Sequence, residues 1–499
     1  MRLNMPLASI TLATVCAALT GCMVGPSIRA PKTTMPAHWA ESAQAHPPKT
    51  AAATMPAPMS KVTNSPAHLA QWWKNFHDPE LTLLINRAAR GNLTLQEATQ
   101  QIIESREIRD AASANLGPFV TGVSSYQHSR SSKNIGNGGN FGPSESDLYQ
   151  AGFDATWELD FFGQVRRGIQ AANANYRAAI ENQRGVWLTL LSELADDYMT
   201  LRGVQRQIAV TVANLQTQRH TVAILEQQIG GGLSTSLALA NASAQLATTE
   251  SQLPELRIQE KQLFYAMSIL LGQPPQTLEK QLAVPRPIPS VPPVVPIGLP
   301  SELLLRRPDV RQAEEQYAAA TANVGVAEGN LFPQFTINGN LGFAASDAAK
   351  WFDANSLTYG IGPGVSWSIL NWGQVQSNIN QQKAIRIQAF LNYRQTVLQA
   401  LDDVNSALAA YTREQLHEKL LFEAMAQNQK AVKYSTQLYE NGLTDFLNVL
   451  SAQQALYTSQ DALVQSQSAV STDLVALYKA LGGGWESAPA AAAKPKERK

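Results

Sequence analysis

The side chains that commonly carry out catalysis or bind metals are few in this sequence and widely spaced. Seven histidines occur in 499 residues, and none of them stand at a spacing typical of a metal site, so surface or packing roles are expected for them. These are His38, His46, His68, His77, His128, His220 and His417. No Ser-His-Asp, Cys-His or paired-carboxylate arrangement is recognisable from spacing either. The sequence therefore predicts no enzyme, no metal site and no cofactor.

Two other motifs have structural explanations. The triple glycine in IGGGLSTS, residues 229–236, is a weak match to a phosphate-binding loop, but no Lys follows it and no strand precedes it. A turn between helices is the favoured interpretation. Arg306, Arg307 and Asp309 surround Pro308, which indicates a helix start with an acidic first turn rather than a reactive site.

Cys22 is the residue whose surroundings predict a defined modification. Residues 1–21 combine Arg2 with an apolar run of signal-peptide length, and Leu19-Thr20-Gly21-Cys22 resembles the bacterial lipobox. The lipobox implies that residues 1–21 are removed and that Cys22 becomes the lipidated first residue. An ordinary secretory signal with an incidental cysteine is the alternative. Met23 follows where an inner-membrane retention signal usually has Asp, which points to the outer membrane.

Composition excludes one large class of partners. The chain has 39 basic and 39 acidic residues, so it lacks the positive charge of a nucleic-acid-binding protein. Cys16 lies inside the signal peptide, so no disulfide is possible within one mature chain. Beyond the signal, no stretch is apolar for long enough to cross a membrane as a helix. Residues 22–66 are expected to be an extended N-terminal segment, and 486–499 a disordered tail.

An internal repeat dominates the organisation of the chain. Trp157 and Gly163 recur as Trp367 and Gly373, both 210 residues later, and the same spacing continues for more than a hundred residues. Upstream, Asn115-Leu116-Gly117-Pro118 resembles Asn330-Leu331-Phe332-Pro333 at a spacing of 215. The two spacings differ by five residues, and these extra residues fit the Ser, Asn and Gly-rich segment 129–146, an expected hairpin loop. The predicted organisation is a first repeat at 67–272, a Pro-rich connector at 273–300 and a second repeat at 301–485.

Each repeat is expected to contain two strands. Apolar and polar residues alternate over 151–161, 335–343 and 359–369, which is the pattern of strands with one apolar face. A first strand near 119–126 alternates poorly. Strands of about ten residues are long enough to cross a bilayer at a tilt.

Long helices are expected after the strands. Residues 164–228 and 374–440 contain no proline, and each would extend roughly 100 Å at 1.5 Å per residue. Their many small and polar residues suggest close packing with one face in water, as in the wall of a helical tube. Glycines that accept positive φ are expected to reverse the chain at IGGGLSTS and at YENGLTDF.

Four strands are too few to close a barrel. Membrane barrels begin at about eight strands, and open edges in lipid leave backbone groups unpaired. Closure must therefore come from further copies of the chain. The strand count alone permits a dimer of eight or a trimer of twelve.

Five motifs, in order along nearly the whole mature chain, identify a family. The sequence resembles the TolC-like outer-membrane factors, in particular the NodT-type lipoproteins of tripartite efflux systems. The motifs are CMVGP after the lipobox, LLLRRPDVRQAE at 303–314, NLFPQFTINGNLG at 330–342, NGLTDFLNVLSAQQALY at 441–457 and LYKALGGGW at 477–485.

This resemblance implies an α+β membrane protein that forms a homotrimer. A twelve-stranded outer-membrane β-barrel would continue into a twelve-helix α-barrel in the periplasm, with two pseudo-repeats per chain. The expected function is a passive, lipid-anchored export duct served by a periplasmic membrane-fusion adaptor and an inner-membrane pump of the RND type. A duct for type I protein secretion and a structural coiled-coil envelope lipoprotein are the alternatives.

The resemblance also assigns roles to residues. Adaptor-docking tips are implied at Gly232, Leu233 and Ser234 and at Gly442, Leu443 and Thr444, and the strand-helix junctions at Trp157, Gly163, Trp367 and Gly373. The periplasmic gate corresponds to Leu447, Asn448 and Ser451, with Asp445 as the nearby carboxylate. Relatives often have acidic residues at the gate, whereas this chain has none at Leu447, Asn448 and Ser451. Closure through an apolar ring is therefore expected here.

Overall fold

The computed structural model describes residues 23–31, 35–39, 60–63, 65, 69–130, 132, 145–231 and 234–488. The chain divides into two compact units, each made of three separate segments. The first unit combines residues 1–32, 102–179 and 313–393, and the second combines 33–101, 180–312 and 394–499. The predicted signal peptide 1–21, Cys22, Gly232 and Leu233 lie outside the described residues.

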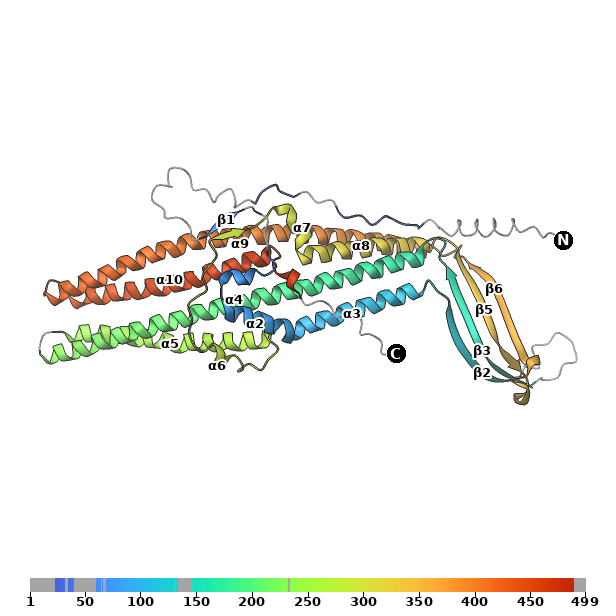
Figure 1. Ribbon diagram of the computed structural model, residues 1–499, viewed down its shortest axis with the longest axis horizontal. Helices are drawn as coiled ribbons and strands as arrows, with labels where there is room; N and C mark the ends of the chain where they lie inside the picture. Colours follow the sequence, from blue (N-terminus) through green and yellow to red (C-terminus); the bar gives the residue numbers. More distant parts are fainter. Residues whose placement is uncertain are drawn as a thin grey trace. The chain divides into compact units, whose positions relative to one another are not determined.

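The first unit contains a four-stranded antiparallel sheet (Figure 1). Its strands are β2 (Phe119–Arg130), β3 (Glu145–Leu159), β5 (Gln334–Ala345) and β6 (Leu357–Ser366). The order across the sheet is β2-β3-β5-β6, and every neighbouring pair is antiparallel. Strands β2 and β6 are therefore the two edges.

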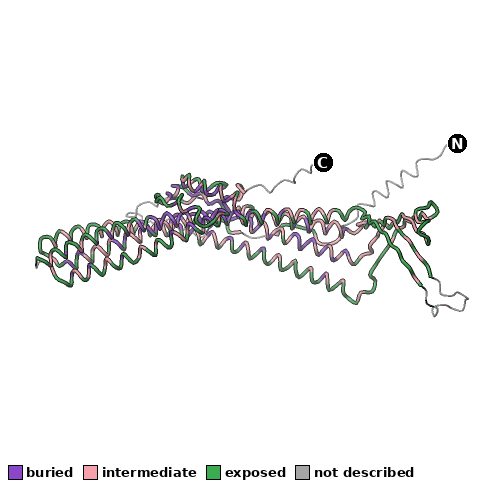
Figure 2. Tube along the Cα trace, turned by 90° about the horizontal axis from the view of Figure 1, so that it is seen from below, coloured by how far each residue is buried: buried purple, intermediate pink, exposed green. Residues whose placement is uncertain are grey.

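The sheet has one apolar and one polar face. Phe153 pairs with Leu341, which pairs in turn with Tyr359, so these three side chains form one apolar row. Asp154 and Asn340 form the adjacent row on the opposite face. The apolar row is open to the surroundings, with Phe153 62% and Tyr359 80% exposed, and Figure 2 shows exposed positions along much of these strands. The predicted alternation is confirmed, although β6 ends at Ser366 and does not include Ile369.

Six helices occur in three pairs of equal length. They are α3 (Leu93–Ala114) and α8 (Pro308–Gly329) with 22 residues, α4 (Gln164–Gly230) and α9 (Gln374–Glu440) with 67, and α5 (Ser236–Leu270) and α10 (Phe446–Ala480) with 35. The predicted long helices are confirmed to within two residues at their ends. They extend so far because neither contains proline, which would remove a helical hydrogen bond.

The second unit has an aromatic core, seen as the densest group of buried positions in Figure 2. Trp72 is fully buried and stacks on Tyr478 of α10 with ring centroids 5.1 Å apart. The Tyr198 hydroxyl of α4 donates a 2.8 Å hydrogen bond to Asp78, which also caps the next helix. The short helix η2 and the cap of α2 thus hold α4 and α10 together.

The shorter helices of the described chain are η2 (Trp72–Phe76), α2 (Pro79–Gly91), α6 (Glu279–Leu282), η3 (Pro300–Glu302), α7 (Leu303–Arg306), η4 (Ala348–Lys350), η5 (Ala354–Ser356) and η6 (Trp485–Ser487).

The segments outside the two predicted repeats contain short elements of their own, and one expectation for them needs correction. Within the N-terminal segment, β1 (Lys61–Thr63) pairs in parallel with β4 (Val294–Pro296) of the connector, so both segments contribute to a small sheet. The predicted disordered tail begins too early, since 486 and 487 belong to η6, where Trp485 lies under the guanidinium of Arg184. No helix in the described part of the chain has the length and apolarity that crossing a membrane requires.

Candidate functional site

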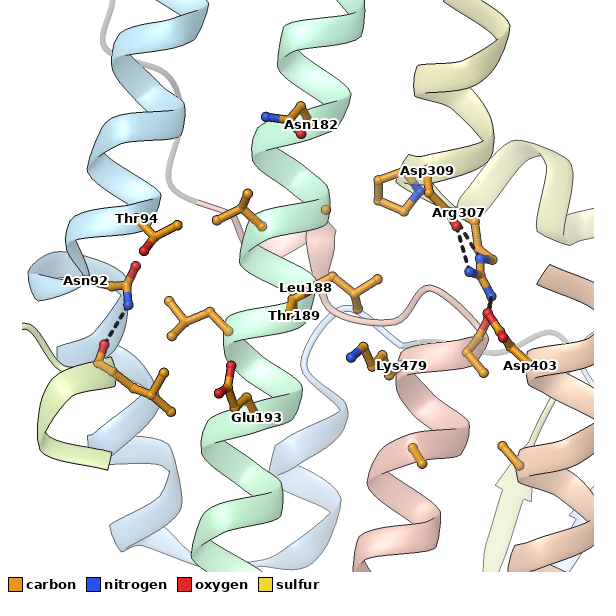
Figure 3. A pocket seen from close by; sticks show the side chains of 18 of the residues that line it. Asn92, Thr94, Asn182, Leu188, Thr189, Glu193, Arg307, Asp309, Asp403 and Lys479 are labelled. Atoms are coloured by element: carbon orange, nitrogen blue, oxygen red, sulfur yellow. Dashed lines mark hydrogen bonds and ion pairs between the residues drawn. The ribbon is translucent and has the colours of Figure 1, made fainter. Parts of the chain in front are cut away.

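A cavity of about 960 Å³ in the second unit lies where the shorter helices meet end to end (Figure 3). Side chains from α3, α4, α8, α9 and α10 line it, among them Glu193, Asp403 and Lys479, together with Asn92 and Arg307. Asn92 precedes α3 and Arg307 precedes α8. The cavity is thus bordered by two helix joints, one from each half of the chain.

The Asn92 joint connects the end of α5 to the start of α3. The Asn92 side chain accepts a 2.8 Å hydrogen bond from the Leu95 N–H and donates a 2.9 Å bond to the Leu270 carbonyl. Two otherwise unpaired groups at helix ends are satisfied in this way. Gly272 ends α5 with a φ of +67°, and its chain passes directly over Gly91. The side chain that bridges the two helix ends is thus a neutral amide.

The Arg307 joint connects the end of α10 to the start of α8. Its buried guanidinium donates a 3.1 Å bond to the Ala480 carbonyl, and two of its nitrogens contact Asp309 at 3.0 and 2.7 Å. It also forms a 2.9 Å ion pair with Asp403 of α9. Gly482, with a φ of +69°, lies against Arg307 as Gly272 lies against Gly91.

The two joints are equivalent in sequence. Arg307 follows Asn92 by 215 residues and Ala480 follows Leu270 by 210, which are the two spacings of the repeat. The sequence predicted Arg306, Arg307 and Asp309 to mark a helix start, and α8 does begin at Pro308. The contacts of Arg307 with α9 and α10 were missed, although its alignment with Asn92 at the repeat spacing was a usable signal.

Three carboxylates, Glu193, Asp196 and Asp197, lie within five residues of one another on α4, and Glu193 lines the cavity. Burial, together with the charges of Asp196 and Glu193, raises the pKa of Asp197 to about 7. Burial also raises the pKa of Asp473 on α10 to about 6, with further contributions from Glu414 and Asp196. No group of three or more His, Cys, Asp or Glu side chains in the described residues could hold a metal ion.

The strand-helix junctions of the first unit have matching geometry. The Trp157 indole donates a 2.8 Å hydrogen bond to the Leu116 carbonyl, and the Trp367 indole donates a 3.1 Å bond to Leu331. Gly163 and Gly373 stand directly before α4 and α9 with φ of +80° and +83°, which favours glycine. Each indole thus ties the end of its hairpin to the helix end that precedes the hairpin.

The tip of the second helical hairpin is built by a glycine. Gly442 has a φ of +71°, and the Leu443 N–H donates a 2.8 Å bond to the Leu438 carbonyl, which is the Schellman arrangement of a helix end. Leu443 is 72% exposed. In the first hairpin Ser234 is half-buried ahead of α5, while Gly232 and Leu233 lie outside the described residues. Thr444 accepts a 2.6 Å bond from the Asn448 amide.

The predicted gate residues share one face of α10. Leu447, Asn448 and Ser451 are exposed, whereas Phe446 and Val449 are buried on the other side of the helix. The buried pair packs with Leu225 of α4 and with Ala238 and Ala242 of α5. Asp445 precedes α10, and its side chain makes no capping bond. The first turns of α10 therefore have their apolar side inward and the predicted gate residues outward in a single copy.

Comparisons with known proteins agree with this architecture. The family model for outer membrane efflux proteins matches residues 84–273 and 299–483. The pyoverdine export outer membrane protein OpmQ of Pseudomonas aeruginosa is 32% identical over 425 residues, covering 84% of this chain and 88% of OpmQ. The cation efflux system protein CusC of Escherichia coli K12 is 28% identical over 474 residues, covering 94% and 98%.

A solved structure matches over almost the whole chain. The outer-membrane channel OprN has a TM-score of 0.86 and 32% identity, with coverage of 93% of this chain and 100% of that structure. The family model and the relatives are described as outer-membrane, export or efflux proteins and the solved structure as an outer-membrane channel, and none of these descriptions is of an enzyme. The chain therefore belongs to the outer membrane efflux protein family and acts as the outer-membrane channel of a tripartite efflux pump.

Proposed function

We propose that three copies of the chain form one passive duct for small molecules across the outer membrane and periplasm. The observation that carries this proposal is a four-stranded sheet with an apolar face and two edges, β2 and β6. Edges left open in lipid would cost several kcal/mol for each unpaired backbone group. Three copies would bring twelve strands and join every edge to another.

The helical hairpins are the proposed contacts with a periplasmic adaptor. Gly442, Leu443 and Thr444 form a narrow, exposed turn in which Leu443 offers an apolar contact. A Cβ at Gly442 would meet no atom within 4 Å, so the turn leaves room for a close approach by another backbone. By the repeat spacing, Gly232, Leu233 and Ser234 would serve in the same way on the first hairpin. Energy would come from an inner-membrane pump of the RND type.

A lipid on Cys22 would anchor the first unit next to its strand-helix junction at Gly163. Met23 contacts Gly163, and the Val24 N–H donates a 3.1 Å bond to the Phe162 carbonyl. The Arg167 guanidinium donates further bonds to the carbonyls of Val24 and Gly25. Because Cys22 is bonded to Met23, the lipid would start one residue from the strand-helix junction.

Closure of the duct is assigned to the exposed face of α10. Three copies of Leu447 around an axis would make an apolar ring that resists wetting, and Asn448 and Ser451 would extend it with neutral groups. The similar proteins are named for pyoverdine and for cations. We therefore assign the choice of substrate to the pump and not to the duct.

Single-channel recording in planar bilayers tests both the duct and its gate. The purified protein should conduct, and Leu447→Ala should raise conductance by about twofold or more, because a smaller ring wets more readily. Leu237→Ala is the matched control, since Leu237 is the repeat equivalent of Leu447 on α5 and is 63% exposed. A protein that never conducts would contradict the duct. Equal effects of the two substitutions would contradict a gate on α10.

A further inference from the structure

The first strand-helix junction is covered by the second repeat. Phe162 stacks on Phe332 with ring centroids 4.6 Å apart and an interplanar angle of 21°. The Gln164 amide donates a 3.0 Å bond to the Asn330 side chain. A Cβ at Gly329, the last residue of α8, would lie 2.9 Å from the Gln164 Cβ. The start of α4 thus packs against the end of α8, next to the paired strands β3 and β5.

The second junction presents equivalent groups without a cover. By the repeat spacing of 210, Trp372 corresponds to Phe162 and Gln374 to Gln164. Trp372 is 93% exposed and has a φ of 49°, an uncommon conformation for a residue other than glycine. A Cβ at Gly373 would meet no atom within 4 Å, whereas one at Gly163 would collide with Met23. Among the described residues of one copy, the second junction therefore lacks the close cover that the first one has.

The repeat also identifies what should cover it. At the spacing of 215, Phe332 corresponds to Gly117, Asn330 to Asn115 and Gly329 to Ala114, the last residue of α3. These residues lead into β2, as their counterparts lead into β5. Because β2 and β6 are opposite edges of the sheet, a single copy cannot bring them together.

We infer that Trp372 packs over Gly117 of the partner subunit, while Gln374 meets Ala114 and Asn115 of the partner subunit. This inference rests on the proposed trimer and specifies its contact between copies. The side chains are complementary in size, since a Phe-Phe stack in the first junction becomes a large Trp over a Gly in the second. A Cβ at Gly117 would meet only the Ala114 carbonyl oxygen, at 3.6 Å, so the place opposite is open. The Gln and Asn of the polar contact recur in both repeats.

Cysteine crosslinking in the full-length, detergent-extracted protein tests the contact. Gln374→Cys combined with Ala114→Cys should give disulfide-linked dimers and trimers on mild oxidation, whereas either substitution alone should not. The link cannot form within one copy, because the two edges lie about 14 Å apart across the sheet and a disulfide needs Cα atoms within about 7 Å. Gln164→Cys with Gly329→Cys is the matched control, and its disulfide should stay within one chain.

Complementation provides the second measurement. Gly117→Phe has room within one copy but should clash with Trp372 of the partner subunit. Overpacking of this kind should lower the trimeric fraction by about tenfold. Adding Trp372→Gly should restore trimer by reversing the large and small partners. If Trp372 instead lay in lipid as an interfacial aromatic residue, the second substitution would restore nothing.

The outcomes separate this contact from the duct itself. A trimer that conducts but gives no 114–374 crosslink, while the 164–329 control does crosslink, would overturn the inference and leave the proposed function standing. An unsubstituted protein that neither forms a trimer nor conducts would contradict the proposed function. Crosslinked trimers together with rescue by Trp372→Gly would establish the contact.

Discussion

The two helix joints beside the cavity share a backbone design but differ in charge. In both, a helix ending in a left-handed glycine meets the start of a shorter helix, and one side chain donates to the last helical carbonyl. Asn92 does this as a neutral amide, whereas Arg307 does it as a buried cation between two carboxylates. The repeat therefore preserves the hydrogen bond to the carbonyl and not the residue that makes it.

The residues facing the joints differ in a matching way. On α4, Glu193, Asp196 and Asp197 precede their repeat equivalents Asp403, Ser406 and Ala407 on α9 by 210 residues. The α9 side thus keeps one carboxylate and pairs it with Arg307. The α4 side keeps three, and burial, followed by the charges of Asp196 and Glu193, raises the pKa of Asp197. One half of the chain neutralises its charge with a cation, and the other retains protons on its carboxylates more readily.

The largest effect is expected from Arg307→Met. This substitution keeps most of the buried stem but removes every polar contact of the guanidinium, leaving the Ala480 carbonyl unpaired. We expect a loss of about 3 kcal/mol in unfolding free energy, the low end for a broken buried pair, because Asp403 and Asp309 remain partly hydrated. Urea unfolding followed by circular dichroism measures it.

A second substitution sharpens this result. Adding Asp403→Leu should recover part of the lost stability, since the unpaired carboxylate would no longer be present. If Arg307→Met cost no more than the loss of a neutral cap, the distinction between a charged and a neutral joint would have no energetic meaning.

A smaller loss is expected from Asn92→Ala. It removes the cap on Leu95 and the bond to Leu270, which together stabilise the first joint by about 1.5 kcal/mol. Asn92→Ser is the control that separates these two contributions, because Ser still caps the helix but is too short to reach Leu270. Its loss should be about half as large. Equal losses for Ala and Ser would assign the whole effect to the Leu270 bond.

Much of the fold follows from local patterns in the sequence. Alternating residues locate β3, β5 and β6, and proline-free runs locate α4 and α9, because both patterns extend over many residues. The pairing of β1 with β4 could not be predicted, since strands of three residues in Pro-rich segments have no measurable period. Local pattern therefore predicts elements, and not the contacts of short ones.

The site shows the same limit. The glycine tips and the outward face of α10 follow from turn chemistry and helical spacing around Gly442 and Leu447. The contacts of Arg307 join residues 96 and 173 positions apart, which no local spacing encodes. Comparison of the repeats is what makes such contacts visible, as the pairing of Asn92 with Arg307 illustrates.

The smallest effect is expected from Asp197→Asn, and it should depend on pH. The carboxyl of Asp197 has a pKa of about 7 in the folded chain, against about 4 when unfolded, so the folded state binds this proton more tightly. Its contribution to stability is complete below pH 4 and is lost as the pH rises through 7. The asparagine variant should lack this decline and exceed the wild type by about 1 kcal/mol at pH 8, a value reduced for solvent screening of a half-exposed group.

Urea unfolding from pH 4 to pH 8 measures that difference, with Asp473→Asn as the matched control on α10. The pKa of Asp473 is raised only to about 6, so its replacement should flatten the profile less and only up to pH 6. Neither variant touches Arg307, whose guanidinium stays charged across this range. If the dependence of unfolding free energy on pH became flatter with Asp473→Asn but not with Asp197→Asn, the proton uptake would belong to α10. The contrast between the carboxylate-rich α4 and the neutralised joint at Arg307 would then be wrong.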